Sequence, residues 1–255
     1  MKVVISVVSH NHFGIIKSLG GLPPLAQEFE VYLIDNVGEH GLQQWCKSNK
    51  IDYILNDKPL GFGENNNKIF NHVYSGYIEE NCWFLILNPD VIVQVEDIYK
   101  LLDNMKADHS RLATINLFKD QSYSVYDNAV RNFPTLADFM KSYLLGKNPS
   151  ILDKSEIKEP RKVDWASGSF LMFDANLYKS IRGFDSRYFM YCEDIDICLR
   201  SSILQKENVT YYPSIKALHF AAHSNRKLLS KSFIWHLKSI VRYLRVKNTL
   251  GRRTV

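Results

Sequence analysis

Acidic residues are missing from the end of this chain, because residues 208–255 contain no aspartate or glutamate. The same segment carries ten lysines and arginines, whereas residues 1–207 carry 22 basic and 27 acidic side chains. An acidic body with a basic end argues against a nucleic-acid-binding protein and predicts an anionic partner at one end of the molecule.

Long apolar runs are absent as well, which excludes a membrane-spanning helix. The four cysteines have no paired metal-ligand spacing, and most have apolar neighbours, so we expect reduced, buried thiols. The first residues, MKVVISVVSHN, reach polar side chains too early for a secretory signal and are typical of a strand. We therefore expect a cytoplasmic protein that lies peripherally on the cytoplasmic face of the inner membrane.

The first half of the chain alternates apolar strands with helices. We expect strands at 2–9, 30–36, 51–56 and 82–93, and helices near 14–28, 40–49, 64–80 and 95–107. Nearly continuous apolar strands separated by helices predict an α/β fold with a mostly parallel sheet covered on both faces. Ligands of such sheets collect at the carboxyl ends of the strands.

Small polar or acidic side chains follow each of the four predicted strands. They are Ser9 to His12, Asp35 and Asn36, the loop LGFGENNN (60–67), and Asn88 to Asp90. The loop is not a Walker motif. Its asparagines either cap the helix that follows or donate to a ligand that its glycines allow to approach closely.

In the second half, residues 108–160 give no site prediction. VDWASGSFLMFD (163–174) has a strand pattern around a small-residue turn, a helix follows at 175–181, and 210–220 reads as strand, loop and strand. Trp165, beside that turn, is either a core residue or a platform on which an acceptor sugar stacks.

The segment FMYCEDIDICLR (189–200) places three carboxylates in an apolar and aromatic run. On a helix, Glu193 and Asp196 share a side that reads as a solvated face, and Asp196 can pair with Arg200. Asp194 instead falls at the border of the apolar stripe, where burial can tune its pKa.

Taken in order, these motifs resemble family 2 glycosyltransferases of the GT-A fold, specifically bacterial rhamnosyltransferases of O-antigen and cell-surface polysaccharide assembly. The resemblance rests on VVSHN, LIDN, GFGENNN, LNPD, DWASGSF, GFDSRYFMYCEDIDICLR and YYPSIKALH. It implies an inverting transfer of L-rhamnose from dTDP-L-rhamnose to a polyprenyl-diphosphate-linked sugar of the GlcNAc type.

The resemblance also implies roles for individual residues. Asp194 would be the catalytic base, supported by Glu193. Asp90 and His219 would hold a divalent cation, Mg²⁺ or Mn²⁺, although Asn88 replaces the first aspartate of the DxD motif. The donor-binding residues would be Ser9, Asn11, Asp35, Asn36, Gly61, Phe62, Asn66, Asn88 and Asp90. The acceptor-binding residues would be Trp165, Gly168 and Ser169.

The expected organisation is a glycosyltransferase domain over 1–225, with a donor half (1–107) and an acceptor half (108–225), and a basic amphipathic helix over 226–255. The apolar stripe of this helix, which includes Leu237, Ile240, Val241 and Leu244, either docks on the domain or lies on anionic lipid. Two alternatives for the whole protein stay open: a non-catalytic scaffold that binds sugar nucleotides or polysaccharide, and a family 2 enzyme with another donor sugar.

Overall fold

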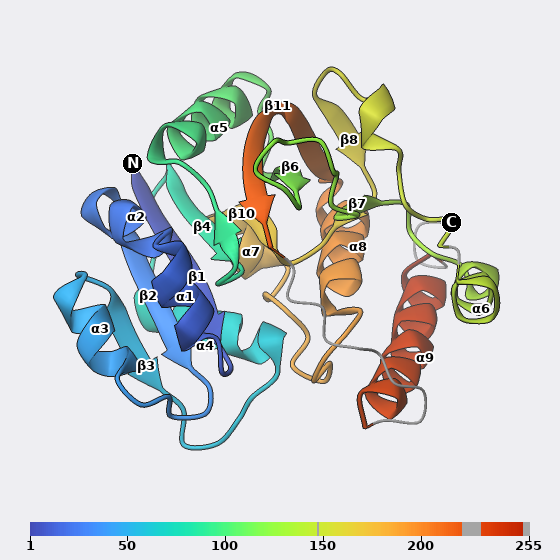
Figure 1. Ribbon diagram of the computed structural model, residues 1–255. Helices are drawn as coiled ribbons and strands as arrows, with labels where there is room; N and C mark the ends of the chain where they lie inside the picture. The colour runs from blue at the N-terminus through green and yellow to red at the C-terminus, as the bar shows by residue number, and fades with distance from the viewer. Residues whose placement is uncertain (147, 221–230, 252–255) are drawn as a thin grey trace.

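A computed structural model of the chain describes residues 1–146, 148–220 and 231–251. Figure 1 shows one central sheet with helices on both sides. Nine strands of the described residues form it, in the order β3-β2-β1-β4-β10-β6-β11-β5, with β8 beside β11. The strands are β1 (Lys2–Ser9), β2 (Glu30–Asp35), β3 (Asp52–Leu55), β4 (Cys82–Leu87), β5 (Val91–Ile92), β6 (Leu112–Phe118), β8 (Arg161–Val163), β10 (Phe170–Asp174) and β11 (Val209–His219).

The strands β1 to β4 are parallel, as the alternation of strands and helices predicts. β10 enters between β4 and β6 and is antiparallel to both, so strands of residues 108–225 continue the sheet of the first half. A small second sheet pairs β7 (Val130–Arg131) with β9 (Trp165–Ala166). The predicted strand–loop–strand at 210–220 is one strand, β11, whose pairing with β6 shifts register between Tyr212 and Lys216.

Alternate side chains of each strand enter different cores, as the pleat requires. On one face, strand residues such as Ile5 and Leu85 pack with α1 (Phe13–Leu19), α2 (Leu22–Glu28), α3 (Leu42–Ser48) and α5 (Val95–Ala107). On the other, residues such as Val4 and Phe84 pack with α4 (Phe62–Val73), α7 (Ala175–Ser180), α8 (Glu193–Gln205) and α9 (Lys231–Gly251). Both faces are therefore covered.

Two predicted helices differ from those observed. The helix expected at 14–28 is two helices, because Gly20 adopts a left-handed conformation (φ 63°) that ends α1. The helix expected at 64–80 starts earlier and ends at Val73, so the asparagines of the 60–67 segment lie inside α4.

The tail helix α9 docks on the domain. Ile240 and Tyr243 are buried, and Ser239 donates to the carbonyl of Met190 at 3.0 Å. Leu237 and Val241 are instead 43% and 48% exposed, so the predicted apolar stripe is only partly buried. The first and last parts of the predicted tail, 226–230 and 252–255, lie outside the described residues.

The prediction that Asp196 lies on a solvated face is wrong. Asp196 is fully buried, its Oδ2 lies 2.7 Å from Nε of Arg200, and Tyr188 donates to its Oδ1. Nη1 of Arg200 donates to the carbonyl of Ile181, which ties α8 to the end of α7. The pairing was predicted correctly, but its surroundings were not, because α9 and the 181–191 segment cover this side of α8.

Removal of one partner from a buried ion pair leaves the other charge without compensation. Asp196→Asn should therefore lower the free energy of unfolding by about 3 kcal/mol. The matched control is Glu30→Gln, which breaks the exposed Lys2–Glu30 pair and should cost less than about 1 kcal/mol. Urea unfolding measures both, and equal small losses would contradict the buried role of Asp196.

Candidate active site

The chain enters α8 through two non-glycine residues in the left-handed region, Tyr191 (φ 72°) and Cys192 (φ 64°). Such residues are uncommon and persist where the surrounding structure holds them. Here they direct Glu193 and Asp194, the first two residues of the helix, toward a cleft of about 430 Å³. The helix N-terminus favours negative charge at this point.

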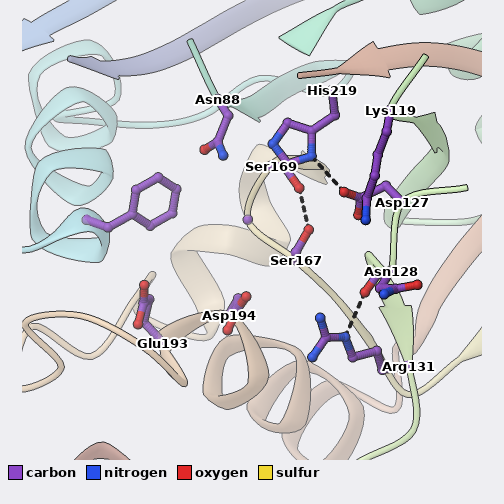
Figure 2. Close-up of a pocket in the computed structure, with 12 residues that line it drawn as sticks. Asn88, Lys119, Asp127, Asn128, Arg131, Ser167, Ser169, Glu193, Asp194 and His219 are labelled. Carbon is purple, nitrogen blue, oxygen red and sulfur yellow. Dashed lines mark hydrogen bonds and ion pairs between the residues drawn. The ribbon is translucent and has the colours of Figure 1, made fainter. Parts of the chain in front are cut away.

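Figure 2 shows Glu193 and Asp194 on one side of the cleft, with His219 and Asn88 on the other. The cleft is lined by Phe62, Asn88, Lys119, Asp127, Asn128, Arg131, Ser167, Gly168, Ser169, Glu193, Asp194 and His219. Seven of these residues were predicted from the sequence to belong to a site. The structure therefore brings predicted donor, acceptor, metal and catalytic residues to one place.

Glu193 is not on a solvated face either. Its side chain is almost completely buried, and its Oε2 has no hydrogen-bond partner among the described residues. Burial, and then the neighbouring charge of Asp194, raise the pKa of Glu193 to about 8. Glu193 is thus held in its neutral form through most of the physiological range.

Asp194 is half-buried, and its carboxylate is hydrogen-bonded. The backbone N–H of Ile195 donates to Oδ1 at 2.9 Å, and the N–H of Gly168 donates to the carboxylate as well. Burial raises the pKa of Asp194, and these two hydrogen bonds and the charge of Arg131 offset part of that rise. A fixed carboxylate of raised pKa, open to a cleft, is suited to accept a proton.

The turn Ser167–Gly168–Ser169 connects this carboxylate to the end of β4. The N–H of Asn88 donates to the carbonyl of Ser169 at 2.9 Å, and the hydroxyls of Ser167 and Ser169 are hydrogen-bonded to each other. A Cβ on Gly168 would lie only 2.7 Å from the ring of Phe62, so this position requires glycine. The turn and the start of α4 thereby form one packed wall of the cleft.

His219 lies between two aspartates. Its Nδ1 lies 3.1 Å from Oδ2 of Asp127, and its Nε2 lies 3.4 Å from Oδ1 of Asp90. Burial lowers the pKa of His219, but its hydrogen bonds to Asp127 and Asp90 outweigh this effect and raise the pKa to about 9. A carboxylate on one ring nitrogen that orients the other nitrogen toward a second ligand is typical of histidine metal ligands.

The predicted nucleotide residues form a second group at the ends of β1 and β2. Asp35 is fully buried, and its carboxylate accepts from the N–H groups of Val37, Gly38 and Glu39 and from the hydroxyl of Tyr53. Its side chain therefore shapes the turn at 37–39. Recognition of a base by Asp35 stays a prediction.

Glu39, which no motif singled out, holds this group together. Its carboxylate accepts from the hydroxyl of Ser9 and from the N–H groups of Asn11 and Phe13. Asn36 connects the group to the next loop, because its side chain donates to and accepts from the backbone of Leu60. A ligand at this end would meet a loop whose polar groups are already ordered.

The asparagines of α4 serve the fold rather than the cleft. Asn66 is fully buried between the hydroxyl of Ser6 and the carbonyl of Phe62, while Asn67 holds the backbone of Phe184. Gly61 is required because a Cβ there would lie 2.6 Å from the carbonyl oxygen of Phe189. Gly61 was expected to make room for a ligand, but in the structure it allows two chain segments to pack closely.

Trp165 is not an open platform for a sugar. It is only 4% exposed, its Nε1 donates to the carbonyl of Asn132, and the guanidinium of Arg131 lies over its ring. The core alternative is therefore the correct one. The ring of Trp165 supports the guanidinium of Arg131, and Arg131, not Trp165, lines the cleft.

The family model for Glycosyl transferase family 2 matches residues 16–195 of the chain. The chain belongs to glycosyltransferase family 2. This family 2 enzyme is 38% identical to Rhamnosyltransferase WbbL of Escherichia coli over 98% of this chain and 96% of that protein. It is 34% identical to the N-acetylglucosaminyl-diphospho-decaprenol L-rhamnosyltransferase of Mycobacterium tuberculosis, over 64% of this chain and 54% of that one.

Solved structures confirm the GT-A fold of this glycosyltransferase. GalNAc-T7, crystallised with UDP, GalNAc and Mn²⁺, matches with a TM-score of 0.67 at 13% identity, over 96% of this chain and 48% of that chain. Staphylococcus aureus TarS 1–349, in complex with UDP-GlcNAc, matches with a TM-score of 0.63 at 14% identity, over 96% and 66%. At these identities the likeness shows the fold alone.

Sequence reasoning missed the cleft residues of the 119–131 segment, namely Lys119, Asp127, Asn128 and Arg131. This segment has little regular structure beyond the two residues of β7, so it offers no periodicity to read. The placement of Asp127 depends on β11, which carries His219 to it from 92 residues away. Such a contact leaves no local signal.

The burial of Glu193 predicts a pH dependence of stability. An ordinary glutamate ionises near 4.3 in an unfolded chain, so the raised pKa of Glu193 costs stability as pH rises from about 4.5 to 8. Glu193→Gln cannot ionise. Its stability relative to the native protein should therefore increase across this window, by up to about 1.4 kcal/mol per pH unit.

Urea unfolding of both proteins at pH 5.5 and pH 8 measures this effect. Glu159→Gln, at an exposed position, is the matched control and should show no such trend. A constant difference between Glu193→Gln and the native protein at both pH values would mean that Glu193 is ionised throughout.

Proposed function

We propose that the enzyme transfers L-rhamnose from dTDP-L-rhamnose to a GlcNAc unit carried on a polyprenyl diphosphate, in the assembly of an O-antigen or another cell-surface polysaccharide. The observation that carries this proposal is the match to a rhamnosyltransferase along nearly the full length of both chains. The name of the mycobacterial relative supports the lipid-linked acceptor.

Asp194 is the general base in this proposal. It removes the proton from the attacking hydroxyl of the acceptor while that oxygen forms a bond to the anomeric carbon of the donor sugar. The bond from this carbon to the diphosphate breaks at the same time, and its electron pair leaves with the nucleotide. Glu193, neutral and adjacent, can donate a hydrogen bond to a sugar oxygen without competing for the proton.

Asp90 and His219 would hold Mg²⁺ or Mn²⁺. The donor set fits such an ion, because one carboxylate oxygen and one imidazole nitrogen converge and Asp127 orients the imidazole, whose Nε2 would lose its proton as the ion binds. No group of three or more metal-ligating side chains was found among the described residues, so substrate phosphates would complete the coordination. The ion would neutralise charge on the leaving diphosphate.

The acceptor enters on the side of the cleft that Lys119 and Arg131 line, in this proposal. Both side chains are cationic and face the same space as Asp194. An acceptor sugar that presents its hydroxyl to Asp194 would bring its own diphosphate within reach of these cations. Gly168 and Ser169 would contact the sugar between them.

The proposed location is the cytoplasmic face of the inner membrane. No described helix is both long enough and apolar enough to cross a bilayer. The protein would therefore reach a lipid-linked acceptor from the membrane surface, with the basic α9 near anionic lipid.

The role of Asp194 as general base can be tested by substitution. Asp194→Asn keeps the size of the side chain but removes its basicity, so turnover should fall by roughly 10²- to 10⁴-fold. The affinity for dTDP-L-rhamnose should change little, because Asp194 acts on the hydroxyl of the acceptor and does not hold the nucleotide. Native turnover in Asp194→Asn would remove Asp194 from the chemistry, and donor binding without turnover by the native protein would favour a non-catalytic scaffold.

The donor and the metal can be tested together by thermal shift. dTDP-L-rhamnose with Mn²⁺ or Mg²⁺ should raise the melting temperature more than the nucleotide sugar alone, and UDP-sugars should have less effect. Asp90→Ala should abolish the contribution of the metal, because no charged oxygen replaces the lost ligand. Stabilisation by UDP-sugars alone would favour the alternative of another donor sugar.

A further inference from the structure

Helix α6 (Leu136–Leu145) has no buried residue, although most of its side chains are apolar. Leu136, Met140 and Leu144 are 56%, 54% and 77% exposed and follow each other at intervals of four, so they lie on one face of the helix. Leu145, at the end of the helix, is also exposed, at 67%. Clustered exposed apolar side chains of this kind mark an interaction surface.

The helix is well defined at both ends. Thr135 and Asp138 form a capping box at its start, and Gly146 ends it in a left-handed conformation (φ 65°). The sequence thus specifies a helix here even though the helix buries nothing in the domain. Helices this short are marginal in water, so the apolar face is expected to contribute to a contact.

The adjoining side of α6 contacts α9. The ring of Phe139 lies 6.1 Å from that of Tyr243, and the hydroxyl of Tyr143 lies 2.5 Å from Nδ1 of His236. Figure 1 places α6 at the edge of the molecule, beside α9 and away from the central sheet. The contact with α9 therefore fixes the helix and leaves the face of Leu136, Met140 and Leu144 outward.

Charge near this face is mainly positive. Lys141 is exposed on α6, and Lys247 of α9 donates to the carbonyl of Pro134, just before α6. Asp138 is the acidic residue of α6, and its carboxylate accepts from Thr135 in the capping box at the start of the helix. An exposed apolar face with basic residues beside it is complementary to an anionic lipid surface.

We propose that α6 inserts Leu136, Met140 and Leu144 into the boundary of a bilayer that contains anionic lipid, while Lys141, exposed on the same helix, contacts the headgroups. The helix has ten residues and so lies in the interface without crossing it. This proposal rests on the proposed function, because a lipid-linked acceptor is what would bring the enzyme to a membrane. Arg131, which lines the cleft, precedes α6 by five residues, so the inserted helix lies close to the acceptor side.

The test is sedimentation of the full chain with vesicles, without donor or acceptor. Vesicles of phosphatidylethanolamine and phosphatidylglycerol are compared with vesicles of phosphatidylcholine. The double variant Met140→Gln, Leu144→Gln should bind the anionic vesicles at least about tenfold more weakly than the native chain. Its melting temperature should be unchanged, because both side chains are exposed.

The matched control is the double variant Tyr77→Gln, Leu204→Gln, whose side chains are 90% and 48% exposed outside α6 and α9. It should bind vesicles like the native chain. Native binding by the α6 variant would overturn the proposal. The proposal would also be overturned if the native chain did not bind anionic vesicles and light scattering showed a dimer for the native chain but a monomer for the α6 variant. The face would then join two copies of the chain.

The proposed function can fail separately. Transfer to a short-chain, water-soluble acceptor is measured on the same proteins. Vesicle binding without any transfer of rhamnose would leave the proposal for α6 in place and remove the proposed reaction. Equal transfer by the native chain and the α6 variant, with weaker vesicle binding by the variant, supports both.

Discussion

Two adjacent carboxyl groups, the buried Glu193 and the half-buried Asp194, are held at the start of α8 against an open cleft. Burial opposes ionisation of both groups, and the charge of Asp194 further opposes ionisation of Glu193. The two groups differ in the hydrogen bonds and charges that surround them. Asp194 receives two backbone N–H groups and the field of Arg131, whereas one oxygen of Glu193 has no partner among the described residues. One group can thus act as a base while its neighbour keeps a proton.

The rest of the fold supplies the groups that this arrangement needs. The antiparallel strand β10 places the Ser167–Gly168–Ser169 turn between Asp194 and Asn88, and β11 carries His219 to the edge where β4 ends. The parallel strands β1 and β2 end in a separate polar group organised by Glu39. The carboxyl groups come from α8, Arg131 comes from the small second sheet, and the predicted nucleotide residues come from the ends of β1 and β2 in the central sheet.

Much of this could be predicted from local patterns. The apolar strands and the ends that carry Ser9, Asp35 and Asn88 were readable because side-chain periodicity and chain direction are local properties. The placement of Asp194 at the border of the apolar stripe of α8 also followed from helical spacing. The prediction for Asp196 gave the correct partner and the wrong environment, because spacing along one helix does not reveal what covers it.

The features that were missed depend on contacts between distant segments. Trp165 looked like a sugar platform beside a small-residue turn, but Arg131 covers its ring. The glycines of GFGENNN looked like room for a ligand, but the backbone of Phe189 occupies that room at Gly61. Whether a single carboxylate base, Asp194, carries out the transfer is tested by the anomeric configuration of the product, measured by NMR. A single base predicts a configuration inverted relative to the donor sugar, whereas a retained configuration would require a covalent intermediate and exclude this mechanism.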